Sequence, residues 1–146
     1  MAKKTKIKID EAKFNEALKL RDKSEYNKAI RLLKDLLKEN PDAPEIYGVL
    51  GGIYFNIDKY NEAFHYMKKT TILSPKSELA SLGVFHSLWE LGKKKEALEE
   101  MDRILELKPD SENFIPLLRG LEKDAGNGQL NKIIFDIKKV ADKHLA

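Results

Sequence analysis

The chain has 146 residues, 42% of them hydrophobic and 35% charged, and Lys plus Arg exceed Asp plus Glu by 27 − 24 = +3. This length fits one ordinary domain, which can bury a core without disulfides or a structural metal. The absence of cysteine excludes thiol catalysis and cysteine-ligated metal.

The sequence indicates neither a targeting segment nor a membrane segment. No apolar run approaches the roughly 20 residues that span a bilayer, and no apolar segment follows the basic start MAKKTKIKID. We therefore expect a cytoplasmic protein. Lysine clusters at 3–8, 68–69, 93–95 and 138–139 lie far apart in the chain. Because a nucleic-acid surface needs a clustered basic patch, nucleic acid is a disfavoured partner.

Six helices are predicted from apolar residues that recur at helical spacing. In chain order they lie near residues 11–23, 26–39, 44–57, 60–73, 78–91 and 94–107. Asp10 is the predicted N-cap of the first helix, with Ile9 and Phe14 placed as a hydrophobic staple.

A repeat of 34 residues groups these helices into pairs. Two sets of residues recur at this spacing, the alanines Ala29, Ala63 and Ala97 and the prolines Pro41, Pro75 and Pro109. Each proline follows the second helix of a pair and is predicted to end it, because the residue before proline avoids the helical region. A fixed period of this size is typical of a helical-repeat array.

After residue 111 the period fails. DAGNGQ at 124–129 predicts a loop between a short helix near 112–124 and a longer one near 129–144. The longer helix has an apolar face made of Leu130, Ile133, Ile134, Ile137 and Ala141. Since a stacked array needs a terminal cap with a polar outer face, residues 112–146 are predicted to form capping helices. A basic tail, residues 1–9, precedes the array.

The second unit carries a specific pattern, Tyr47-x2-Leu50-Gly51-x2-Tyr54, then Ala63-x3-Met67, then Pro75. It resembles the tetratricopeptide repeat (TPR) family, whose pattern is W-x2-L-G-x2-Y, A-x3-F, P. The resemblance covers about residues 10–111 and implies an all-α, right-handed solenoid of helical hairpins with units 10–43, 44–77 and 78–111. In the third unit large and small residues are exchanged, with Ser81 at the ring position and Phe85 at the glycine position.

The resemblance also implies where a ligand binds. In this family the first helices of successive units line a concave groove, and the second helices form the convex back. Carried onto this chain, the groove positions are Phe14, Leu18, Gly48, Gly52, Phe55, Leu82, His86 and Trp89. The implied rim positions are Arg21, Asn56 and Glu90.

Three glycines in YGVLGGIYF, residues 47–55, stand inside one predicted helix, where each costs roughly 1 kcal/mol relative to alanine. Gly51 occupies the glycine of the family pattern, where the two helices of a unit approach closely. Gly48 and Gly52 are four residues apart and share one helix face. They either floor an open recess or accept a neighbouring ring such as that of Phe85.

Trp89 and the histidines are the remaining candidate site residues. Tryptophan in a helical hairpin is usually a core residue, but Phe85 and Leu88 already supply the core-facing stripe, so we place Trp89 in the groove. The three histidines, His65, His86 and His144, have no second ligand at helical spacing, so no metal site is predicted. No nucleophile and base stand together either. We therefore expect no catalytic residue and no cofactor, and a contact role for His86.

The groove positions favour an apolar ligand. Family members that bind the C-terminal carboxylate of heat-shock chaperones use lysine, arginine and asparagine on these first helices. Here the corresponding positions are Phe14, Leu18, Val49, Leu79 and Gly83, so that clamp is absent. An apolar concavity suits a peptide or helix of a partner protein, similar to the bacterial secretion chaperones.

The predicted function is therefore a non-catalytic protein-interaction module, a chaperone or an adaptor. Several alternatives stay open. The chain could be an immunity or antitoxin-type partner protein, or a homodimer that uses the groove. The basic N-terminal tail could also fold into the groove as an internal ligand.

Overall fold

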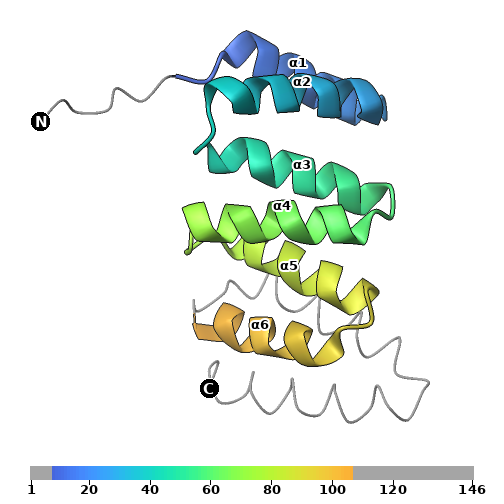
Figure 1. Cartoon of the computed structure of the whole chain (residues 1–146), viewed down its shortest axis with the longest axis vertical. Helices are drawn as coiled ribbons and strands as arrows, with labels where there is room; N and C mark the ends of the chain where they lie inside the picture. The colour runs from blue at the N-terminus through green and yellow to red at the C-terminus, as the bar shows by residue number, and fades with distance from the viewer. Residues whose placement is uncertain (1–7, 107–146) are drawn as a thin grey trace, which may run out of the picture.

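The computed structural model describes residues 8–106, a range that contains helices and turns but no strand. Its six helices are α1 (Glu11–Asp22), α2 (Tyr26–Glu39), α3 (Pro44–Asn56), α4 (Tyr60–Leu73), α5 (Glu78–Glu90) and α6 (Lys94–Glu106). They form three hairpins stacked in chain order (Figure 1). This arrangement confirms the predicted all-α helical solenoid. The predicted capping helices at 112–124 and 129–144 lie outside the described residues, as does the tail up to residue 7.

The helix starts follow capping chemistry. The Asp10 side chain accepts a hydrogen bond from the backbone N–H of Lys13 at 3.1 Å, which confirms it as the N-cap of α1. Ser77 caps α5 in the same way, accepting from the N–H of Ala80 at 3.2 Å, a cap that the sequence analysis did not identify. Pro44 opens α3 at a position where its missing N–H costs nothing.

The turn inside each hairpin repeats every 34 residues. Ser24, Asp58 and Gly92 have positive φ angles of 60°, 61° and 77°. In each turn the residue that follows donates its N–H to the carbonyl five residues earlier, as Lys59 does to Tyr54 at 2.9 Å. This is the Schellman arrangement, which satisfies the last carbonyls of the first helix. The repeat is thus present in backbone geometry as well as in residue type.

The core lies where neighbouring helices meet. The period-34 alanines, Ala29, Ala63 and Ala97, are all fully buried, so the second helix of each hairpin presents only a methyl group to the core at this position. The largest fully buried aliphatic side chains of the first two hairpins are Leu33, Leu36, Ile46, Leu50 and Ile53. None of the helices within residues 8–106 is long and apolar enough to cross a bilayer.

The third hairpin fills its exchanged positions with a polar network. Ser81 is fully buried, and Arg103 of α6 donates to its hydroxyl and, at 3.0 Å each, to Glu100 Oε1 and the carbonyl of Pro75. Burial raises the pKa of Glu100 above its ordinary value, while the charges of Arg103 and Lys68 oppose that rise. The guanidinium therefore pairs the buried hydroxyl that stands at the ring position of the repeat.

Candidate functional site

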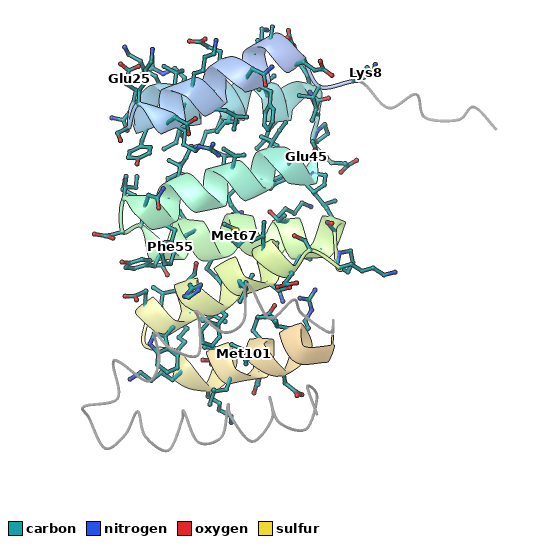
Figure 2. All side chains as sticks on the ribbon, turned by 180° about the vertical axis from the view of Figure 1, so that it is seen from behind. Lys8, Glu25, Glu45, Phe55, Met67 and Met101 are labelled. Atoms are coloured by element: carbon teal, nitrogen blue, oxygen red, sulfur yellow. The ribbon has the colours of Figure 1, made fainter. Side chains whose placement is uncertain are left out.

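A groove of about 1000 Å³ runs along α3 between α1 and α5. These three helices are the first helices of their hairpins and supply most of its lining, with smaller contributions from α4 and the α4–α5 turn. Figure 2 shows Glu45 and Phe55 toward opposite ends of α3, with Met67 near the middle of the stack. Seven of the eight implied groove residues line it, namely Phe14, Leu18, Gly48, Gly52, Phe55, Leu82 and His86. Two of the three implied rim residues, Arg21 and Asn56, line it as well.

The middle of the groove is an open recess. A Cβ built on Gly52 would meet no atom within 4 Å, and one built on Gly48 would lie 3.7 Å from Thr70 Cγ2, an ordinary contact. Phe85, the ring that could have filled this space, is almost fully buried and stacks on Trp89 instead. The two glycines therefore expose helix backbone to the groove.

Gly51 has a different role on the same helix. A Cβ on Gly51 would lie 2.8 Å from Met67 Cγ, and one on Gly83 of α5 would lie 2.7 Å from Met67 Sδ. Both distances are shorter than real side chains tolerate. Met67 of α4 thus lies between two glycines, and the close helix approach implied for Gly51 is confirmed.

One end of the recess is walled by aromatic rings. Phe55 lies edge-on to Tyr60, with centroids 5.2 Å apart, and edge-on to His86 at 6.1 Å. The Tyr60 hydroxyl donates to Asp58 Oδ1 at 2.9 Å, which fixes this ring in turn. The surrounding atoms displace solvent from the His86 ring and lower its pKa below the ordinary 6.5, although the side chain stays exposed on one side. His86 is therefore mainly neutral at pH 7.

Trp89 and Glu90 are corrections to the expected site, because neither lines the groove. The indole stacks on Phe85 at 5.7 Å with an interplanar angle of 27°, and Lys94 Nζ lies 5.4 Å from its ring centroid. Helical spacing placed Trp89 on the side of His86, but the ring four residues earlier and the lysine of α6 hold it away from the groove. Glu90 is exposed at the end of α5.

Several lining residues were missing from the expected set. Glu45, Thr70 and Ser77 line the groove near the starts of α3 and α5 and along α4. Glu45 lies three residues before Gly48 and so shares its helix face, a signal that could have identified it. Thr70 and Ser77 belong to α4 and to a turn, which the family's groove positions do not include.

The groove has few formal charges. The basic side chain that lines it is Arg21, at the end of α1, and the acidic one is Glu45, at the start of α3. Arg21 contacts Asp22 through Nε and Nη2, each 3.1 Å from Oδ1. Within residues 8–106 no three His, Cys, Asp or Glu side chains gather in a way that could hold a metal ion. His144 lies outside that range.

Comparisons with known proteins agree with this architecture. Two family models described as tetratricopeptide repeat match residues 20–63 and 86–111. No curated protein matches the sequence.

Several solved structures share the fold at low sequence identity. The type III secretion chaperone SycD of Yersinia enterocolitica, in complex with a peptide of the translocator YopD, aligns with a TM-score of 0.69 and 16% identity over 88% of this chain and 91% of that one. The second TPR domain of human RPAP3, in complex with the HSP70 peptide SGPTIEEVD, aligns at 0.63 and 19% over 86% and 92%. The Sgt2 TPR domain of Aspergillus fumigatus aligns at 0.63 and 17% over 91% and 79%.

The two family matches fall on the helices that form the stacked hairpins. The first match spans the end of α1 to the start of α4, and the second runs from α5 through α6. With its stacked hairpins, buried period-34 alanines and repeated Schellman turns, the chain contains tetratricopeptide repeats, which the family models match at residues 20–63 and 86–111.

Proposed function

We propose that this chain is a non-catalytic protein-interaction module that binds an apolar segment of a partner protein in the groove along α3, as a chaperone or an adaptor. The open, weakly charged groove with its recess at Gly52 carries this proposal. Its volume of about 1000 Å³ is at the upper end of the roughly 300–1000 Å³ range of ligand sites. Apolar walls with a few polar groups at the ends suit a peptide segment better than a reactive substrate.

The character of the groove separates two kinds of relative. The human RPAP3 domain is in complex with a peptide that ends in the acidic sequence EEVD. In this chain the positions that hold a carboxylate in such proteins are Phe14, Leu18, Val49, Leu79 and Gly83, and all of them line the groove. At these five positions an acidic terminus would lose its hydration without gaining a cation. SycD, which shares the fold, is in complex with a peptide of a translocator, and this supports a protein segment as the ligand.

Two exposed aliphatic residues provide a matched test. Leu79 is 72% exposed and lines the groove, whereas Ile72 is 62% exposed and does not. Leu79→Ser and Ile72→Ser each remove a large apolar side chain from the surface, and neither creates a cavity. We expect Leu79→Ser to weaken partner binding about tenfold, a loss of about 1.4 kcal/mol, and Ile72→Ser to leave it unchanged.

The measurement has two stages. Proteins retained from a lysate of the source cells by the wild type and by both variants are identified by mass spectrometry, and the affinity of each purified candidate is then measured by calorimetry at two salt concentrations. A partner that distinguishes the two variants supports the groove. Equal affinities for all three forms would contradict it, and a steep fall in affinity with salt would instead indicate binding through the lysines.

A further inference from the structure

Building on the proposed function, we infer that the occupant of the groove is an amphipathic α-helix of about three turns, with one bulky apolar side chain seated over Gly52. A protein segment can enter a groove as an extended strand or as a helix. The polar groups, length and charges of this groove discriminate between the two.

The central lining offers almost no hydrogen-bond partners. Leu18, Val49 and Leu82 are apolar, and the helix backbone at Gly48 and Gly52 is paired within α3. The Thr70 hydroxyl donates to the Tyr66 carbonyl at 2.8 Å.

An extended strand would bury its own N–H and C=O groups against such a surface, and each unpaired group costs about 1–3 kcal/mol. The few polar side chains of the lining, among them His86 and Asn56, cannot pair a whole strand. A helix satisfies its backbone internally and needs only apolar side chains from the groove.

The length of the groove fits a short helix. Its lining runs along α3 from Pro44 to Asn56, and these 12 residue steps of 1.5 Å each give about 18 Å. That distance is about three helical turns. A bound helix of this length presents apolar residues at i, i+3 or i+4, and i+7.

The recess at Gly52 provides an anchor site. Its Cβ direction is empty, and Phe55 beside it is held between Tyr60 and His86. A rigid apolar pocket near the middle of an interface is where binding energy usually concentrates. We therefore expect a leucine or aromatic side chain of the bound helix at this point.

The charges are complementary to such a segment. The central part of the lining has no formal charge, while Arg21 stands at the end of α1 and Glu45 at the start of α3. The complementary helix has an uncharged stripe over three turns, which contacts the centre of the lining. It also has an acidic residue that pairs with Arg21 at one end and a basic residue that pairs with Glu45 at the other.

The test uses two pools of synthetic peptides, about four helical turns long, with identical composition. In one pool the apolar residues recur at helical spacing, and in the other they alternate with polar residues as in a strand. The full-length chain is purified as wild type, as Gly52→Leu and as Asn61→Leu, and the peptides carry a fluorescent label. Asn61 is an exposed residue of α4 outside the lining, so it receives the same side chain away from the groove.

The inference requires the helical pool to bind the wild type at least about tenfold more tightly than the strand pool, as measured by fluorescence anisotropy. It also requires Gly52→Leu to lose that binding and Asn61→Leu to keep it. Circular dichroism should show both variants folded, since a Cβ at Gly52 meets no atom within 4 Å and Asn61 is exposed. This control separates a filled recess from an unfolded protein.

Three outcomes would overturn the inference. Tighter binding of the strand pool, still lost in Gly52→Leu, would replace the helix by an extended segment and leave the proposed function standing. A homodimer that dissociates in Gly52→Leu would make a second copy the occupant. If neither pool bound in a manner that depends on Gly52, both the inference and the proposed groove function would fall.

Discussion

The interface between α2 and α3 and the interface between α4 and α5 hold equivalent positions of the repeat but contain opposite kinds of side chain. Leu36 of α2 corresponds to Thr70 of α4, 34 residues later, and Ile53 of α3 corresponds to Ser87 of α5. All four are buried. We call the first interface the aliphatic seam and the second the small-residue seam. Helices α4 and α5 pack against each other more extensively than α2 and α3 do, as Figure 1 also indicates.

The difference shows two ways to join hairpins. The aliphatic seam is stabilised by the burial of large side chains, which hold the helices apart. In the small-residue seam the helices come closer, and the buried hydroxyls bond to carbonyls of their own helix, Thr70 to Tyr66 and Ser87 to Gly83, both at 2.8 Å. Those bonds remove the cost of burying a polar group. One seam should therefore be sensitive to the loss of volume, and the other to its gain.

The largest expected effect is in the aliphatic seam. Ile53 is fully buried, so Ile53→Ala should lower the free energy of unfolding by about 2–5 kcal/mol through lost burial and a cavity. The equivalent Ser87→Ala removes only one hydroxyl and a local hydrogen bond, so it should cost about 1 kcal/mol or less. Urea unfolding of both variants measures the contrast. Similar losses for the two would show that the seams are not distinct.

The next effect is in the small-residue seam. Gly83→Ala places a methyl group against Met67, which Gly51 confines on its other side, so unfolding free energy should fall by about 1–3 kcal/mol. Truncating the obstacle, Met67→Ala, should make the double variant less destabilised than the sum of the two single changes. A double-mutant cycle in urea tests this coupling. Strict additivity would mean that Met67 does not limit the approach of α5.

A smaller effect with the opposite sign is expected on the groove face of α3. Gly52→Ala meets nothing within 4 Å and relieves a helix-interior glycine, so it should raise the free energy of unfolding by about 0.5–1 kcal/mol. Gly51→Ala, one residue earlier, faces Met67 and should lower it. Thermal unfolding of the pair gives the signs directly. If Gly52→Ala also proved destabilising, the glycine would be a packing residue and the recess would not be available to a ligand.

Much of the fold could be predicted because the same pattern of residues recurs in each 34-residue unit, so each unit gives independent evidence for the same pair of helices. The six predicted helices begin where the structure begins them and end within one residue of the observed ends. Most residues that line the groove could be placed too. The helical register turns Gly48 and Gly52 of α3 toward the same groove that Leu18 of α1 and His86 of α5 line. Such positions depend on spacing alone.

Side-chain positions that depend on contacts with neighbouring residues could not be predicted in this way. Spacing gives Trp89 a direction from the axis of α5, but the stacking on Phe85 and the cover by Lys94 decide where the ring lies. The small-residue seam was missed for a related reason. A search for apolar residues passes over Thr70 and Ser87, whose hydroxyls become compatible with burial only through bonds within their own helices.

The smallest expected effect is a pH dependence at His86, which occupies the position 34 residues after Gly52. Its pKa is lowered in the folded chain because the groove displaces solvent from the ring. The unfolded chain therefore binds a proton more readily, and stability must fall as the pH drops from about 6.5 toward the lower folded value. Above about 6.5 both states are neutral at this residue and the contribution is constant.

Glu100 acts in the opposite direction over neighbouring pH values. Its pKa is raised by burial, so protonation favours the folded state, and stability from this residue falls as the pH rises above the ordinary glutamate value. The pH dependence of wild-type stability therefore combines two opposed contributions, one from His86 and one from Glu100. The difference between wild type and His86→Gln, measured by urea unfolding from pH 7 to pH 5, cancels the Glu100 term. We expect the wild type to lose stability relative to His86→Gln over that range, and a bound apolar helix that covers the ring to steepen the loss.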